Sequence, residues 1–185
     1  MHQEIIISGF GGQGVLFVGQ LLAYAGLEEG RHVTWIPSYG PEMRGGTCHC
    51  TVIISDEDIG SPLVRNPTVA IVLNPPSMER YAPRVKPNGV LIRDATLVAA
   101  QSNRADMREI ALPAKDIATE LGRPQMANVV LAGALVAATG VVKAETLEKV
   151  LEEHTGTRYR DALETNKRAL RRGMEYVAEH SVSTN

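Results

Sequence analysis

The stretch from residue 4 to residue 15, EIIISGFGGQGV, constrains the fold of this chain more than any other part of the sequence. A short run of apolar residues ends in a glycine-rich turn, and a long apolar segment follows. Gly9, Gly11 and Gly14 stand in the G-x-G-x-x-G spacing, which allows a sharp turn after a strand, a close approach of the backbone to a ligand, and tight packing of the next helix. The pattern therefore predicts a strand, a turn and a helix at the start of an α/β domain.

Apolar runs and turn residues along the rest of the chain continue this alternation of strands and helices. We expect one domain over residues 1–185, built as a mostly parallel, Rossmann-like sheet flanked by helices, with a helical C-terminal third. Strands are predicted over residues 4–8, 32–36, 47–54, 68–73, 89–93 and 108–112, with a short hairpin arm over 59–64. Helices are predicted over residues 14–29, 77–85, 113–121, 125–139, 143–153 and 157–180.

The first predicted helix, residues 14–29, connects the first two predicted strands. Together they should form a parallel, right-handed β-α-β unit. This helix is apolar almost all round, and charge appears only at Glu28 and Glu29. We therefore expect it to be largely buried.

Composition argues against several classes of protein. The formal net charge is −2 and aromatic residues make up only 4% of the chain, so neither a basic patch nor a stacking platform for nucleic-acid binding is expected. No apolar stretch reaches the length of about 20 residues that a membrane-spanning helix needs. A strand pattern begins at once, without a signal-peptide pattern before it, and we expect a cytoplasmic protein with no membrane contact.

The glycine-rich turn has two interpretations. Gly11, Gly12, Gln13 and Gly14 could contact an anion or a cofactor through N–H groups at the helix start, or they could only close a tight helix–sheet contact. A dinucleotide site also requires an acidic residue after the second strand, to bind ribose hydroxyls. This chain has Ile-Pro-Ser at residues 36–38, and NAD binding is therefore disfavoured.

A second unusual stretch covers residues 38–47, where three glycines and one proline exclude a helix interior or a regular strand. Such loops after a sheet strand are where α/β proteins bind ligands. Arg44 would bind a carboxylate or a phosphate with its forked guanidinium, and Glu42 would orient it. The alternative is a structured crossover with a surface ion pair. The candidate residues of this loop are Tyr39, Gly40, Pro41, Glu42, Arg44 and Gly45.

Two cysteines, Cys48 and Cys50, flank His49 in the strand that follows this loop. Alternation along a strand places the two thiols on one face and the imidazole on the other. A single C-x-C pair offers too few ligands for a zinc or iron–sulfur site, which usually needs four, so no metal site is expected on this chain. Asn128 lies within an apolar helix and must find hydrogen-bond partners, either as a cap or across to a loop.

Three blocks of the sequence become specific when they are read together. They are residues 9–15 (GFGGQGV), 38–46 (SYGPEMRGG) and 52–56 (VIISD), and residues 126–128 (Met-Ala-Asn) support the same assignment. In this order and spacing they resemble the gamma subunit of the 2-oxoacid:ferredoxin oxidoreductases, which include the 2-oxoglutarate, 2-ketoisovalerate, pyruvate and indolepyruvate enzymes. The resemblance covers essentially the whole chain and is strongest over residues 4–140.

The resemblance implies an enzyme that oxidatively decarboxylates a 2-oxoacid to the acyl-CoA and passes the electrons to ferredoxin. It implies that thiamine diphosphate, Mg²⁺ and iron–sulfur clusters are held by alpha, beta and ferredoxin-like delta subunits, and that this chain alone binds no cofactor. The loop with Tyr39 to Gly45 would face the active-site interface, and the glycine loop would lie beside it with CoA as a neighbouring substrate. No catalytic residue is assigned to this chain.

The resemblance leaves the substrate and the assembly open. It favours 2-oxoglutarate, with branched-chain 2-oxoacids or pyruvate as alternatives. A free-standing nucleotide-binding oxidoreductase and a purely structural assembly subunit are the rival functions. The isolated chain is expected to be a monomer or a homodimer. The basic residues 167, 168, 171 and 172 of the last helix form either a solvated face or a subunit contact.

Overall fold

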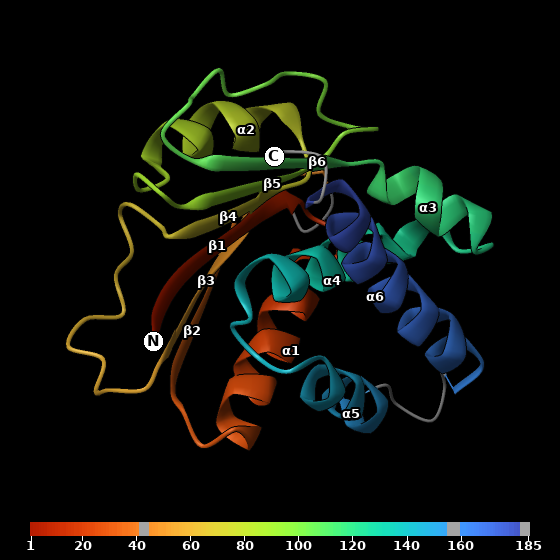
Figure 1. Cartoon of the computed structure of the whole chain (residues 1–185), viewed down its shortest axis with the longest axis horizontal. Helices are drawn as coiled ribbons and strands as arrows, with labels where there is room; N and C mark the ends of the chain where they lie inside the picture. The colour runs from red at the N-terminus through yellow and green to blue at the C-terminus, as the bar shows by residue number, and fades with distance from the viewer. Residues whose placement is uncertain (41–44, 155–159, 182–185) are drawn as a thin grey trace.

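A six-stranded sheet in the order β2-β3-β1-β4-β5-β6 forms the centre of the computed structural model, which describes residues 1–40, 45–154 and 160–181 (Figure 1). The strands are β1 (His2–Phe10), β2 (His32–Tyr39), β3 (Thr47–Ser55), β4 (Val69–Val72), β5 (Val90–Asp94) and β6 (Arg108–Leu112). The helices are α1 (Val15–Glu28), α2 (Pro75–Tyr81), η1 (Ala82–Arg84), α3 (Ala114–Glu120), η2 (Pro124–Met126), α4 (Ala127–Thr139), α5 (Ala144–His154) and α6 (Arg160–Ser181). The predicted α/β class and the helical C-terminal third are confirmed.

The position of β3 differs from the prediction. Strands β1, β4, β5 and β6 are mutually parallel, but β3 lies between β1 and β2 and runs antiparallel to both. Strands β1 and β2 point the same way, as the predicted β-α-β unit requires, but they are not neighbours because β3 lies between them. The reason is the short connection over residues 40–46, because so few residues can join antiparallel neighbours but cannot cross over to a parallel one.

The hairpin arm predicted over residues 59–64 is absent, and these residues form neither helix nor strand. Both edges of β3 are already paired, one with β1 and one with β2, so a returning arm would have no free edge to join. The chain must instead pass to β4, which lies on the far side of β1. Local composition could not reveal this obstacle.

Helices cover the two faces of the sheet unequally. Helix α2 lies on one side, and α1, α3, α4, α5 and α6 lie on the other (Figure 1). The larger core lies under the second group, where alternate side chains of β1 such as Ile5 and Ile7 meet the small apolar residues of α4. Ile6 points to the opposite face and packs in the smaller core beside Met78 and Tyr81 of α2.

Helices α4 and α6 pack unusually closely, which explains the small residues predicted for the first of them. A Cβ on Gly133 would lie 2.0 Å from the carbonyl oxygen of Leu170, and a Cβ on Gly173 would lie 1.9 Å from that of Val130. The two glycines therefore let the helix backbones touch. The first turn predicted for α6, residues 157–159, lies outside the described residues.

The basic residues of α6 bind acidic residues of the same chain. Lys167 Nζ lies 2.9 Å from Glu152 Oε2 of α5, and Arg171 Nε lies 2.7 Å from Glu148 Oε1 of the same helix. Lys167 and Arg171 therefore join α6 to α5, whereas Arg172 lies 3.8 Å from Glu120 of α3. Solvent screens pairs as exposed as these, so they orient the helices more than they stabilise them.

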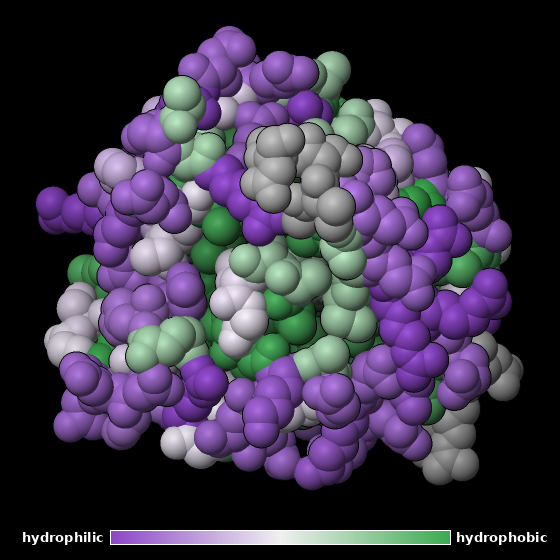
Figure 2. Space-filling view, in the orientation of Figure 1, coloured by the Kyte–Doolittle hydropathy of each residue, from purple (hydrophilic) through white to green (hydrophobic). Residues whose placement is uncertain are grey.

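Helix α1 is less buried than its sequence predicts, because Tyr24 and Leu27 are 40% and 56% exposed. Figure 2 shows hydrophilic side chains around the rim of the visible face and apolar ones gathered near its centre, in front of the region where α4 lies in Figure 1. Within the described residues, no helix combines the length and the apolar character that a membrane crossing requires.

Candidate functional site

The glycine loop at the end of β1 is joined directly to the second glycine-containing loop. Gly11 donates its N–H to the carbonyl oxygen of Gly46 at 2.9 Å, and Gly45 donates its N–H to the carbonyl oxygen of Gly11 at 3.4 Å. The antiparallel register, in which Phe10 lies opposite Thr47, makes this contact unavoidable. The glycine loop and the described end of the second loop therefore lie against each other, as the resemblance implies, at the carboxyl edge of the parallel strands, where α/β proteins place their ligands.

Gln13 fixes the shape of the glycine loop. Its Oε1 accepts the N–H of Phe10 at 2.6 Å, and its Nε2 donates to the carbonyl oxygen of Leu73 at 3.0 Å, beyond the end of β4. A Cβ on Gly9 would lie 2.6 Å from this Oε1. The first glycine of the motif thus makes room for an amide that ties β1 to the β4 segment.

Gly14 is needed for two separate reasons. Its φ of +75° lies in the left-handed region, and a Cβ there would lie 2.1 Å from Asn128 Nδ2. That amide nitrogen donates to the carbonyl oxygen of Gly14 at 3.2 Å. Asn128 therefore bonds across to a loop, as one of the two predicted alternatives states, and it joins the start of α4 to the start of α1.

Two hollows lie on either side of the glycine loop, and Gly12 lines both. The first, the uncharged hollow, has a volume of about 570 Å³ and no charged side chain among the described residues that line it, which are Phe10, Gly11, Gly12, Gly14, Val15, Leu16, Phe17, Tyr39 and Cys48. The second has a volume of about 370 Å³, and its described lining, which includes the cation Lys115, is Gly12, Gln13, Leu73, Leu97, Lys115, Pro124, Gln125 and Ala127. No side chain of the described part of the chain caps the start of α1, and its first turn has no acidic residue. The N-terminal end of this helix can therefore favour an anion.

The structure places only part of the second predicted loop. Tyr39 is the last residue of β2 rather than a loop residue, and its side chain is 63% exposed beside the uncharged hollow. Gly40 donates its N–H to the carbonyl oxygen of Thr47 at 3.3 Å, which continues the β2–β3 pairing, and Gly45 has a φ of +77°. Pro41, Glu42 and Arg44 lie outside the described residues.

The cysteines have the arrangement that strand alternation predicts. Cys48 and Cys50 are buried on the face of β3 that meets α1, and Cys50 Sγ donates to the carbonyl oxygen of Val15 at 3.5 Å. Burial raises the pKa of Cys50 to about 12 and raises that of Cys48 as well, so both thiols stay protonated. His49 lies on the other face, where its ring centre is 5.9 Å from that of Tyr81. Burial lowers the pKa of His49, and the positive charge of the nearby Arg80 lowers it further. Among the described residues, no group of three or more His, Cys, Asp or Glu side chains could hold a metal ion.

Asp94 and Lys115 were not foreseen at this edge of the sheet. Asp94 ends β5 and is fully buried; its Oδ1 accepts the N–H of Thr96 at 3.1 Å and that of Lys115 at 3.4 Å. Its Oδ2 has no hydrogen-bond partner within the described part of the chain, and burial raises the pKa of this carboxyl group. The sequence did contain an indication of this residue, because Asp94 directly follows the strand predicted over residues 89–93.

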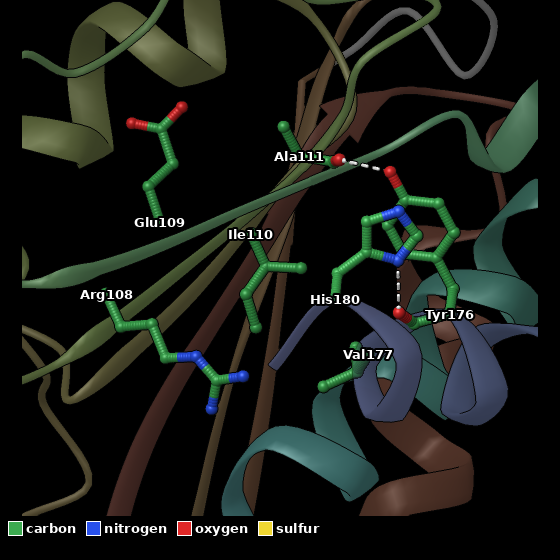
Figure 3. Close-up of a pocket in the computed structure, with 7 residues that line it drawn as sticks. All are labelled: Arg108, Glu109, Ile110, Ala111, Tyr176, Val177 and His180. Atoms are coloured by element: carbon green, nitrogen blue, oxygen red, sulfur yellow. Dashed lines mark hydrogen bonds between the residues drawn. The ribbon is translucent and has the colours of Figure 1, made fainter. Parts of the chain in front are cut away.

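A third hollow of about 500 Å³ lies beside the edge strand β6, between it and α6 (Figure 3). Arg108 and Ile110 point from β6 to the side on which α6 lies, and Glu109 points to the other side. Tyr176 donates its hydroxyl to the carbonyl oxygen of Ala111 at 3.1 Å, and so covers part of the edge strand. None of the predicted site residues lines this hollow, and we regard it as part of the sheet edge.

Gly11, Gly45 and Gly46, the uncharged hollow and the start of α1 thus lie together at one end of the parallel strands of an α/β unit. Comparison with known proteins is more specific. The chain belongs to the family described as pyruvate ferredoxin/flavodoxin oxidoreductase, which matches residues 4–176.

Several relatives are similar over almost the whole chain. Ketoisovalerate oxidoreductase subunit VorA of Methanothermobacter thermautotrophicus is 39% identical over 96% of this chain, which spans only 37% of that relative's length. The 2-oxoglutarate synthase subunit KorC of Methanothermobacter marburgensis is 35% identical over 97% of this chain and 98% of its own length. The crystal structure of a keto/oxoacid ferredoxin oxidoreductase gamma subunit from Geobacter sulfurreducens superposes with a TM-score of 0.81 at 31% identity, over 96% of this chain and 99% of that one.

Proposed function

We propose that this chain is the gamma component of a 2-oxoacid:ferredoxin oxidoreductase, which converts a 2-oxoacid, CoA and oxidised ferredoxin to the acyl-CoA, CO₂ and reduced ferredoxin. Membership of the family and the names of the relatives support the class of reaction. The observation that carries the role of this chain is the backbone pairing of Gly11 with Gly45 and Gly46. That pairing builds one surface from the two sequence blocks at the edge of the sheet where ligands bind.

The cofactors of the reaction belong to other subunits in this proposal. Thiamine diphosphate and Mg²⁺ would lie on alpha and beta subunits, and iron–sulfur clusters on those subunits and a ferredoxin-like delta subunit. The chain contains two cysteines in all, whereas a cubane cluster needs four. The complex would operate in the cytoplasm.

The role of this chain would be to complete the side of the active site that CoA enters. The hollow beside Tyr39 has no charged side chain in its described lining and suits the amide-containing arm of CoA, while the start of α1 suits a phosphate. Arg44 is the proposed anion-binding side chain and Glu42 its orienting partner, and Gly40, Pro41 and Gly45 would shape their loop. Gln13 would act through the loop it holds, because its amide already binds Phe10 and Leu73.

The substrate would be 2-oxoglutarate, with 2-ketoisovalerate as the second candidate. KorC relatives are named for the first and VorA relatives for the second. Ratios of kcat/KM for 2-oxoglutarate, 2-ketoisovalerate and pyruvate in the assembled enzyme would rank them. A highest value for pyruvate would contradict both assignments.

Reconstitution tests the proposed role. The chain alone should show no CoA- and 2-oxoacid-dependent dye reduction, and addition of the other subunits should restore it. Activity of the chain alone would contradict the proposal. Micromolar binding of NAD(P) or flavin in calorimetry would instead favour a free-standing nucleotide-binding oxidoreductase.

Arg44→Ala tests the site itself. Loss of a charge-assisted contact costs roughly 1.5–3 kcal/mol, so the KM for CoA or for the 2-oxoacid should rise roughly tenfold to a hundredfold in the assembled enzyme. Arg65→Ala, at an exposed position outside both loops, is the matched control and should leave both KM values unchanged. Unchanged KM values in Arg44→Ala as well would point to a purely structural subunit.

A further inference from the structure

The outward side of α1 carries no charged residue over residues 15–27. Leu16, Phe17, Gln20, Tyr24 and Leu27 recur at helical spacing and are all at least partly exposed. The side of β2 that meets α1 continues this surface, because Trp35 lies against Gly19 and Val33 lies against Gly26. We call this surface the α1–β2 face, and its members are Leu16, Phe17, Gln20, Tyr24, Leu27, Val33, Trp35, Pro37 and Tyr39.

Such a face is unusual for a helix at the surface of a folded domain. A surface helix normally directs charged residues outward, and α5 and α6 of this chain do so, with Glu148 and Arg171 paired across them. At roughly 200 Å² for each large side chain, Tyr24, Leu27 and Tyr39 alone expose about 300 Å². Apolar patches of about 300–600 Å² are the largest that monomers usually show, and they are often functional.

One aromatic side chain of the face, that of Tyr24, is already held in place. Its ring stacks on that of His154 at 4.0 Å between centres, and the backbone of Tyr39 is fixed by strand pairing. Ordering the Tyr24 ring on contact would therefore cost little, which is typical of aromatic anchors at the centre of an interface. A stable interface needs roughly 800 Å² on each partner, and the half-buried members and the rim of this face can supply the remainder.

We propose that the α1–β2 face docks the polypeptide that longer relatives carry in the same chain as this unit, here a partner subunit with an uncharged, apolar contact surface. The inference rests on the proposed function. This chain spans 37% of the Methanothermobacter thermautotrophicus VorA relative, but it spans 98% of the KorC relative. The same unit thus occurs both inside a longer chain and as nearly a whole subunit. A covalent link keeps two units at a high effective concentration, and without that link the contact surface alone must hold them together.

Continuity with the proposed site favours this occupant over a second copy of the chain. Leu16, Phe17 and Tyr39 belong both to the α1–β2 face and to the uncharged hollow beside the glycine loop. A partner that completes the site at that hollow would extend along α1 without a break. At the far end of the face, Glu28 already binds Lys149 at 2.8 Å, so the charged rim is satisfied within the chain.

The test uses a double variant, Gln20→Lys with Leu27→Lys, in the complex purified through a tag on another subunit. Both positions are exposed, so the isolated variant should keep the far-ultraviolet circular dichroism and thermal midpoint of the wild type. Because buried, unpaired ammonium groups are strongly disfavoured, the amount of this chain in the purified complex should fall at least roughly tenfold. Leu63→Lys makes the same kind of substitution at a position that is 76% exposed and outside the face, and it should leave the complex intact.

Retention of the double variant at the wild-type level would overturn the inference, even if Arg44→Ala changes the KM values and so upholds the proposed function. Sedimentation of the isolated chain addresses the other occupant. The wild-type chain could be a dimer and the double variant a monomer, while the complex still retains the double variant. That result would make the face a contact between two copies of this chain. Failure of the wild-type chain to join any complex would remove the proposed function and this inference together.

Discussion

Replacement of Gly14 by alanine should damage this protein more than its small size suggests. The residue has a φ of +75°, and a non-glycine residue in the left-handed region costs roughly 1–2 kcal/mol. The added Cβ would also lie 2.1 Å from Asn128 Nδ2, so the amide must move. That movement breaks its hydrogen bond to the carbonyl oxygen of Gly14 and leaves a buried amide unpaired, at a further cost of roughly 1–3 kcal/mol.

The expected loss for Gly14→Ala is therefore about 2–5 kcal/mol of unfolding free energy, measured by urea titration with an unchanged slope. Gly30→Ala isolates the backbone contribution. Gly30 has a φ of +70° but no atom within 4 Å of the position of its Cβ, so only about 1–2 kcal/mol should be lost there.

A double-mutant cycle with Asn128→Ala then tests the cause of the excess. Asn128→Ala alone removes a buried hydrogen bond and should cost about 1–2 kcal/mol. In the Gly14→Ala background the same change also relieves the clash, so its cost should vanish, which corresponds to a coupling free energy of about 1–2 kcal/mol in magnitude. Equal losses for Gly14→Ala and Gly30→Ala, together with additive double-mutant effects, would refute the reasoning.

Three further changes give distinct signatures in urea or thermal unfolding. Glu109→Gln removes the carboxylate from buried Arg93 and should cost about 1–3 kcal/mol at neutral pH. Burial raises the pKa of Glu109, but hydrogen bonds from Ser102 and Arg93 outweigh this effect and hold the pKa below its usual range. The stability that Glu109 contributes should therefore fade as the pH falls through the pKa of Glu109 in the folded protein, and a loss that does not depend on pH would contradict this. Asp94→Asn should show the opposite dependence on pH, because burial raises the pKa of Asp94. The wild type should gain stability relative to this variant as the pH falls from 7 toward about 4. A difference in stability that stays constant over this range would count against a buried ionised carboxylate. Gly133→Ala would force α4 away from Leu170 and should lower the free energy of unfolding by about 3 kcal/mol. A decrease in Tm of less than about 3 °C would contradict this expectation.

Local patterns in the sequence predicted most elements of the fold. The strand–turn–helix of residues 4–29, the glycine that follows α1, and the helices after Pro113 all depend on nearest neighbours and on helical or strand periodicity. The pairing of strands depends on which edges are free, and no local pattern contains that information. For this reason the insertion of β3 between β1 and β2 was missed, and so was the absence of an arm over residues 59–64.

The candidate site shows the same division. The sequence indicated both loops and the need of Asn128 for a partner, and the structure shows that Gly11 meets Gly45 and that Asn128 meets Gly14. The role of Gln13 as an internal tie could not be predicted, because its acceptor at Leu73 lies 60 residues away in the chain. Helix α1 was expected to be largely buried because it is apolar almost all round, but its Tyr24 and Leu27 are exposed; under the proposal above, another chain buries them.

The position of β3 also decides which changes in length the protein can survive. The loop contact depends on the opposition of Phe10 and Thr47, eight residue positions along the ladder from that of His2 and Ser55. Deletion of one residue inside β3 would turn Cys48 and Cys50 outward and shift Gly45 and Gly46 by one residue spacing, about 3.3 Å, relative to Gly11. An added residue between Gly40 and Gly45 would leave the ladder intact, because it lies beyond the paired strands. Folding of this chain should therefore tolerate an insertion in that connection better than a deletion within β3, whose register sets the contact of the two loops.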